Sequence, residues 1–130
     1  MNIPEVIDVI EKLEARNNNY WNFYTVVVVA ICGWVISQQG ESISLHVKYT
    51  LIAGNAIFYF MNLSVIYGTT RRIVAFEHEL RALSESEEFS SSELRRNLSK
   101  PFLRYRLKFT LVTHVLMSFF VMLFICIGLK

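Results

Sequence analysis

Three long apolar runs without a single Asp, Glu, Lys or Arg constrain this chain more than any other feature of its sequence. They extend over 17–40, 49–70 and 109–129. A helix needs about 20 mostly apolar residues to cross a bilayer, and each run reaches that length. Hydrophobic residues make up 53% of the 130 residues and charged residues only 18%, so little chain is left for a soluble domain. The sequence predicts an all-α integral membrane protein.

We expect one membrane domain over 1–130. A short amphipathic N-terminal helix precedes three transmembrane helices, and a cytoplasmic helical hairpin extends from the second and third of them. The boundaries are 1–17 for the amphipathic helix, 20–38, 48–70 and 109–129 for the spans, and 71–108 for the hairpin. The segment before the first run is acidic where a cleaved signal peptide is basic, so all three runs should persist.

The distribution of Lys and Arg predicts the orientation. Nine of the 13 lie between the second and third runs, whereas the short connection between the first two runs holds only Lys48. Basic residues concentrate on the cytoplasmic side of a membrane. We therefore expect a multi-pass protein of the plasma membrane, with a bacterial inner membrane favoured, whose amino terminus is cytoplasmic and whose carboxyl terminus is outside.

The first 17 residues have the pattern of a separate amphipathic helix. Ile3, Val6, Ile7, Ile10 and Leu13 recur at helical spacing. Three consecutive Asn residues at 17–19 favour a bend before the first span, since Asn is a weak helix former. Two arrangements are open. The helix lies at the membrane interface with its acids on the basic cytoplasmic connection, or it lies there without a partner.

The second span carries the most specific pattern in the chain, a heptad seam that continues beyond the membrane. It predicts one helix from about Lys48 to Ser84. The polar seam positions in the membrane are Lys48, Asn55, Tyr59, Asn62 and Thr69, and the apolar positions of the cytoplasmic coiled-coil seam are Ile73, Phe76, Leu80 and Leu83. Polar side chains join helices in lipid. The polar seam either holds helices in register or, in several copies, lines a path for ions or water.

The cytoplasmic hairpin is predicted from a serine-rich stretch between two helical arms. Ser90 and Glu93 fit a capping box that starts the returning arm. Pro101 either lies in the first turn of a helix or kinks a continuous one. The outgoing arm should then pack on the returning arm.

The charged residues of the hairpin are expected at its surface. Arg104, Arg106 and Lys108 should lie at the level of lipid phosphates. His78 and either Glu77 or Glu79 are expected on the exposed side of the outgoing arm. The basic residues are mixed with acids, which argues against a nucleic-acid partner.

His114 is the ionisable side chain within the three runs. It lies about 8 Å into the cytoplasmic leaflet, with Thr110 and Ser118 one turn away on the same face. An ionisable side chain inside a membrane predicts function by default, and histidine titrates near neutral pH. His114 is either a proton-sensitive gate or relay, or a neutral residue hydrogen-bonded between helices.

Small side chains in the spans predict packing. Ala30, Gly33 and Ser37 form a small-residue face that favours close helix contact. Cys32 and Cys126 lie at similar depths, where thiols are usually inert packing groups rather than a disulfide.

Catalytic residues, cofactors and metal ions are not predicted. The sequence has no glycine-rich phosphate loop, no paired carboxylates in a span, and no nucleophile with a base at the same depth. His46 and His78 are expected on opposite sides of the membrane, so no depth offers enough metal ligands. We therefore expect a protein that is not an enzyme.

Two functional hypotheses fit these patterns. In the first, the protein is a non-enzymatic homo-oligomer whose second helices associate along the seam, as an ion- or proton-conducting pore or a membrane effector. In the second, it is a small accessory, regulatory or immunity subunit that binds another membrane protein. The seam then closes on the chain's own returning arm and third span. The lipid bilayer is a partner in both.

Overall fold

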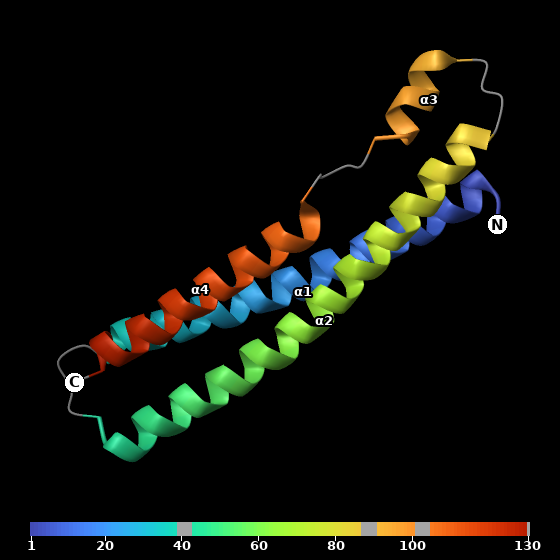
Figure 1. Cartoon of the computed structure of the whole chain (residues 1–130). Helices are drawn as coiled ribbons and strands as arrows, with labels where there is room; N and C mark the ends of the chain where they lie inside the picture. Colours follow the sequence, from blue (N-terminus) through green and yellow to red (C-terminus); the bar gives the residue numbers. More distant parts are fainter. Residues whose placement is uncertain (39–42, 87–90, 101–104, 130) are drawn as a thin grey trace.

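The chain forms a long bundle of three helices with a fourth, short helix at one end (Figure 1). The computed structural model describes residues 1–38, 43–86, 91–100 and 105–129. The helices are α1 (Ile3–Ser37), α2 (Leu45–Ser86), α3 (Ser92–Leu98) and α4 (Arg106–Gly128). Three of them, α1, α2 and α4, are long and apolar enough to cross a membrane. The prediction of an all-helical chain with three helices of spanning length is confirmed.

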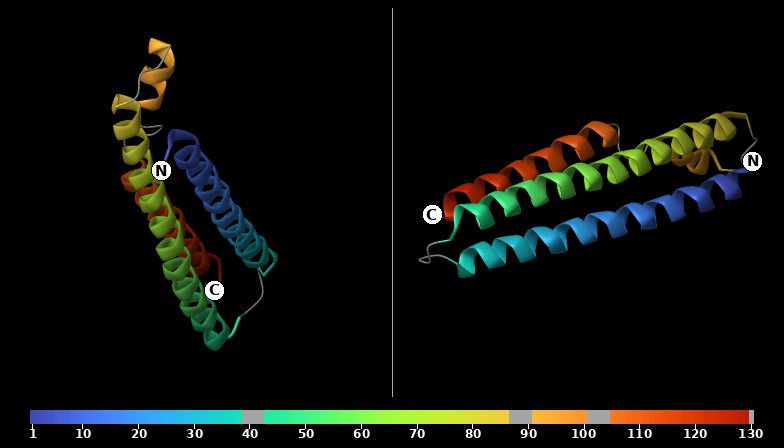
Figure 2. Two further views of the ribbon diagram at one scale, coloured as in Figure 1. Left: turned by 90° about the vertical axis from the view of Figure 1, so that its right-hand side faces the viewer. Right: turned by 90° about the horizontal axis from the view of Figure 1, so that it is seen from below.

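The three long helices lie side by side with α2 antiparallel to α1 and α4 (Figures 1 and 2). Both α1 and α2 extend beyond the first turn of α4, and α3 lies beside the last turns of α2 (Figure 1). We call this the α3 end of the bundle. The carboxyl terminus lies at the opposite end, near the start of α2.

Helix α1 is continuous, so the expected bend at 17–19 is wrong. The helix starts at a capping box in which Asn2 and Glu5 each accept a hydrogen bond from the other's backbone N–H, at 3.0 and 2.9 Å. It then runs without interruption through the three Asn residues, and Asn17 is buried. Weak helix formers cost at most about 0.7 kcal/mol each. Packing of α1 on α2 to both sides of the Asn residues outweighs that cost.

Helix α2 confirms the prediction of one helix through both environments. Its 42 residues give a length of about 63 Å, roughly twice the about 30 Å of a hydrocarbon core. The remainder carries the coiled-coil seam. Ile73 and Leu80 are buried there, and Phe76 and Leu83 pack beside them.

The partner of this seam is the first half of α1, which the sequence reading did not anticipate. The α1 residues that form the apolar cluster with Ile73 and Leu80 are Ile3, Val6, Ile10 and Leu13. The returning arm contributes little in the described residues, because α3 has only seven residues. Leu98 packs on the cluster, and the Arg95 guanidinium donates to the Glu85 carbonyl oxygen at 3.0 Å. Ser90, Pro101 and Arg104 lie outside the described residues.

A second apolar cluster joins the three helices nearer the opposite end. Its buried members are Tyr24, Val35, Tyr59, Val121, Ile125 and Leu129. Gly33 takes no part in it, since a methyl group added there would meet no atom within 4 Å. Close contact instead occurs at Gly128, where a Cβ atom would lie 2.6 Å from Cγ1 of Val35. Within one chain, the close contact predicted around Gly33 is therefore wrong, and Gly128 of α4 supplies one instead; contact of the small-residue face with another copy stays a prediction.

Candidate functional site

Buried and half-buried polar side chains form three groups along the bundle. One lies toward the α3 end, one lies in the middle, and one lies at the opposite end where α4 terminates. The first two groups join all three long helices. Because such groups are costly to bury in lipid unless they are paired, they are the features most informative about function.

The group toward the α3 end is a three-way ion pair of Glu14, Glu77 and Arg106. The Arg106 guanidinium pairs with both oxygens of the Glu14 carboxylate. It also reaches the Glu77 carboxylate, with Nη1 and Oε1 3.4 Å apart. The exposed fractions of the side chains are 16% for Arg106, 7% for Glu77 and 31% for Glu14. One cation therefore serves two carboxylates from two different helices.

This geometry shifts the pKa values of two of its members. Burial raises the pKa of the Glu77 carboxyl above its ordinary value, and the charge of Glu14 adds to the rise, while the charge of Arg106 opposes it. Burial alone would lower the pKa of the Arg106 guanidinium, but the two carboxylates outweigh it, so that pKa is raised. The Glu77 carboxyl group is consequently easier to neutralise than a carboxyl group in water.

The cluster decides one surface assignment made from the sequence and corrects another. Of Glu77 and Glu79, it is Glu79 that is exposed beside His78, whereas Glu77 is buried, because it follows Ile73 by one helical turn on the face that packs against α1 and α4. Arg106 points into the bundle rather than to lipid phosphates, because the buried carboxylates attract it.

The middle group is a hydrogen-bonded network of Tyr24, Asn62, His114 and Ser118, which we call the histidine network. His114 Nε2 lies 3.1 Å from Asn62 Oδ1, and Ser118 Oγ lies 3.3 Å from His114 Nδ1. The Tyr24 hydroxyl lies 3.0 Å from Ser118 Oγ. His114 is 1% exposed. His114 therefore makes the expected hydrogen bond between helices, while its role as a proton-sensitive gate or relay stays a prediction.

The hydrogen-bonding groups impose a direction on this network. An amide oxygen accepts only, so Nε2 of a neutral His114 carries the proton and donates to Asn62. Nδ1 then accepts from the Ser118 hydroxyl, which in turn accepts from Tyr24. A protonated His114 would donate from both nitrogens and force the Ser118 hydroxyl to donate to Tyr24 instead. The network thus has two hydrogen-bonding states that differ by one proton.

Aromatic rings enclose the histidine network. The Tyr24 ring stacks on the His114 ring with centroids 4.4 Å apart, and the Trp21 ring lies 5.8 Å from His114. Tyr59 packs edge-on against Tyr24 at 5.7 Å. These rings cover part of the network and contribute to the burial of His114.

Some buried polar atoms in the interior of the bundle have no hydrogen-bond partner among the described residues. They are Oδ1 of Asn17, the Tyr59 hydroxyl and Oγ1 of Thr70. One of them comes from α1 and two from α2. The interior of the bundle therefore retains unused hydrogen-bonding capacity.

The polar seam residues of α2 face this interior but differ in what they bind. Asn55 and Thr69 bond within α2, because Asn55 donates to the Leu51 carbonyl oxygen at 2.8 Å and Thr69 to that of Val65 at 2.9 Å. Asn62 bonds to His114 of α4, and Tyr59 contacts Tyr24 of α1 through its ring rather than its hydroxyl. Asn62 and Tyr59 are thus the members of this middle part of the seam that contact other helices.

Lys48 forms the third polar group by capping α4. Its Nζ donates to the carbonyl oxygens of Cys126 and Leu129, at 2.9 and 2.6 Å. The last carbonyl groups of a helix have no partner within the helix, and a cation there is favourable. This contact ties the start of α2 to the end of α4. Lys48 therefore has a packing role here.

Tyr24 is a member of these groups that sequence reasoning did not assign, whereas the pair of Glu14 with Arg106 is a contact of the kind expected between the acids of the first segment and the basic connection. A signal for Tyr24 was present: the heptad spacing of the amphipathic segment continues through Asn17 to Tyr24 without a phase break. Following it across 17–19 would also have predicted a continuous α1. Glu14 is adjacent to Leu13, at the edge of the same face.

Within the described residues, no three His, Cys, Asp or Glu side chains are placed to hold a metal ion, and both cysteines are free thiols. No family model, curated protein or solved structure matches the chain. The argument for function therefore rests on the bundle itself.

Proposed function

We propose that the protein is a non-enzymatic, multi-pass membrane subunit that folds as a self-contained three-helix unit and binds another membrane protein through its lipid-facing surface. The observation that supports this best is the hydrogen bond between Asn62 and His114 inside one chain. It gives the polar seam of α2 a partner in the same molecule. Such a chain needs no second copy to hide its polar groups from lipid.

The ion pair toward the α3 end supports the same proposal. Arg106 joins α1, α2 and α4 at the point where α2 leaves the spanning region. A pore lined by α2 seams from several copies would require both the ion pair and the histidine network to open. That would leave buried charges unpaired, at a cost of about 3 to 5 kcal/mol for one pair.

In the membrane, the proposed orientation places the α3 end in the cytoplasm. The Lys and Arg residues near that end support it. The proposed location is a plasma membrane, with a bacterial inner membrane favoured. The partner would then meet the spans within the bilayer and the α1–α2 coiled coil in the cytoplasm.

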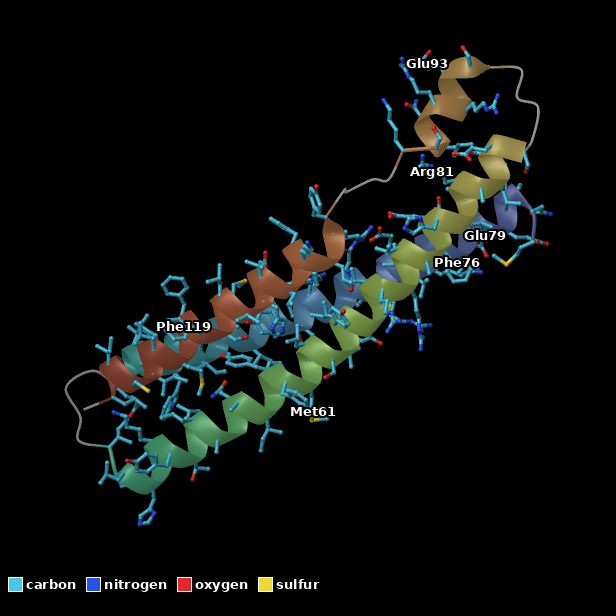
Figure 3. All side chains as sticks on the ribbon, in the orientation of Figure 1. Met61, Phe76, Glu79, Arg81, Glu93 and Phe119 are labelled. Atoms are coloured by element: carbon cyan, nitrogen blue, oxygen red, sulfur yellow. The ribbon has the colours of Figure 1, made fainter. Side chains whose placement is uncertain are left out.

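The surface available to a partner is large and apolar. Met61 on α2 and Phe119 on α4 point away from the bundle (Figure 3), with 64% and 61% of their surface exposed. They lie on separate helices, so each marks a different face. Comparing the two faces tests where a partner binds.

Cysteine crosslinking distinguishes a hetero-complex from a homo-oligomer. In a background without Cys32 and Cys126, single cysteines replace Asn62, Met61 or Phe119, and membranes of the native host are oxidised. We expect no self-crosslinked dimer from Asn62→Cys, and a crosslink to another membrane protein from only one of the two surface positions. A strong Asn62→Cys dimer would contradict the proposal, because Asn62 is buried within one chain.

A second candidate is a homo-oligomeric, proton-conducting assembly. It is favoured by the succession of buried polar groups within each bundle, from Glu77 through Thr69 and Asn62 to His114, and by the unpaired polar atoms among them. The path would run through each chain rather than between copies. Purified protein in vesicles should then dissipate a pH gradient, and His114→Phe should abolish that flux. Absence of flux from the unmodified protein would eliminate this candidate.

A further inference from the structure

An apolar groove lies between α1 and α2, in the half of the bundle away from the α3 end. Its volume is about 560 Å³, within the about 300–1,000 Å³ that is usual for small-molecule sites. Val27 and Ile31 line it from α1, and Gly54 and Phe58 from α2. None of the groove residues carries a fixed charge. Its surface therefore suits a hydrocarbon ligand.

The groove has the depth of one lipid leaflet. From His46 at one end to Phe58 at the other it follows α2 for about 18 Å. One leaflet of a bilayer has about 15 Å of hydrocarbon, half of the about 30 Å core. An acyl chain that enters from the membrane surface would end near the midplane, where Phe58 lies.

The two ends of the groove differ in chemistry. At the midplane end, Phe58 packs against Phe23 and Tyr24 with ring centroids 5.9 and 6.3 Å apart, which closes the groove with aromatic rings. At the other end stand Trp34, which is partly exposed, and His46, which is exposed. Indole and imidazole groups are suited to the headgroup region. The groove is thus closed toward the midplane and polar toward the headgroups.

Gly54 keeps the groove open. A Cβ atom built at this residue would meet no other atom within 4 Å, so a larger side chain would project into free space. In the middle of a helix, glycine costs about 1 kcal/mol relative to alanine. Packing within the chain does not explain a glycine at position 54, whereas the space that it leaves for a ligand does.

We propose that this groove binds one acyl chain of a phospholipid from the leaflet that contains the α1–α2 connection, with the lipid phosphate beside His46. The membrane depth, the length and the closed aromatic end all select a single chain of that leaflet rather than a helix, which is about 10 Å wide with its side chains. An imidazole N–H at the mouth can donate to a phosphate oxygen. The proposal does not depend on the identity of a protein partner.

The test compares two Leu substitutions that differ in their position relative to the groove. Gly54→Leu fills the groove, whereas Gly33→Leu adds the same side chain on the exposed surface of α1 in the same leaflet. Both are made in full-length protein that carries Trp21→Phe, so that Trp34 is the fluorescent reporter. The probe is dioleoyl phosphatidylglycerol, unmodified for native mass spectrometry and brominated on its acyl chains for fluorescence quenching.

We expect the parent protein and Gly33→Leu to retain one phospholipid in detergent and to show strong quenching of Trp34. Gly54→Leu should lower the apparent affinity about tenfold or more, which corresponds to about 1.4 kcal/mol. Thr50→Phe, at the exposed rim of the groove, should act in the same way and guards against a folding defect specific to Gly54→Leu.

Two results would overturn the proposal. Equal lipid retention and quenching in all variants would mean that lipid covers the surface without entering the groove. Unchanged lipid retention in Gly54→Leu together with loss of a crosslinked protein partner would assign the groove to a partner helix instead.

Discussion

Arg106 is the cation that joins α1, α2 and α4, so replacing it by Met should destabilise the bundle through the two carboxylates left behind. Met keeps most of the aliphatic volume and removes the charge. Glu14 and Glu77 would then share a partly buried site without a cation. The expected effect is a lower free energy of unfolding at neutral pH.

The magnitude follows from burial. Removing one partner of a fully buried ion pair costs about 3 to 5 kcal/mol. Here 16% of Arg106 and 31% of Glu14 are exposed, so solvent screens part of the charge. We expect a loss of about 2 to 3 kcal/mol. The same substitution at Arg81 is a matched control, because its pair with Glu85 is exposed and should contribute about 0.5 kcal/mol at most.

The assay is reversible unfolding in mixed micelles of increasing SDS fraction, followed by circular dichroism. A double-mutant cycle with Glu77→Gln isolates the coupling between Arg106 and Glu77, which we expect to exceed about 1 kcal/mol. Acidification should also reduce the loss in Arg106→Met, because protonated carboxyl groups no longer repel one another.

Two results would refute this reasoning. The first is a decrease in the free energy of unfolding that is no larger in Arg106→Met than in Arg81→Met. The second is a loss that does not change when Glu77 is replaced by Gln or when the pH is lowered. Either would mean that the ion pair contributes little to holding the three helices together.

Three further predictions concern other parts of the bundle. Burial raises the pKa of Glu77 above its ordinary value of 4.5. The stability that comes from protonating Glu77 in the folded state is therefore fully present below pH 4.5, and it is lost as the pH rises through the folded-state pKa. Replacing Glu77 by Gln should flatten that part of a curve of unfolding free energy against pH. Asn62→Leu should cost about 0.6 to 2 kcal/mol in the same SDS assay, and its effect should not add to that of His114→Phe, since the two share one hydrogen bond. Additive losses would contradict the shared bond. Gly128→Ala should lower the free energy of unfolding by about 1 to 3 kcal/mol, because the added methyl group overlaps Val35, and a second substitution, Val35→Ala, should relieve that overlap. An unchanged free energy of unfolding in Gly128→Ala would mean that α1 and α4 can separate without cost.

The sequence predicted the positions of the helices more accurately than the contacts between them. Uninterrupted hydrophobicity predicted the three long helices, and the unbroken heptad seam predicted the continuity of α2. The low helix propensity of Asn17–Asn19 led to the wrong prediction of a bend, because helix propensity describes a helix without tertiary contacts. Contacts of α1 with α2 on both sides of these residues decide the outcome.

The candidate site was only partly visible in the sequence. His114 and Asn62 were recognised as polar groups inside spans, which is rare enough to attract notice. Arg106 was assigned to a surface and Glu77 was a candidate for one, because charged residues outside a span are usually exposed. Their burial depends on three helices converging at one level, and no single helix carries that information.

By itself, the sequence determined that this chain is helical, that three of its helices can cross a membrane, and that α2 has one polar face within the membrane and one apolar face beyond it. Helical periodicity and hydropathy are local properties, so a linear reading recovers them. Only the tertiary structure decided what those faces meet: α1 covers the coiled-coil seam, α4 supplies His114 to Asn62, and Arg106 joins two acids. A heptad seam indicates that a helix packs against a partner, but the same side chains could pack against another copy of the chain or against a neighbouring helix of the same chain. Chain connectivity places α1 and α4 beside α2 at high effective concentration, which favours the contacts within one chain that the structure contains.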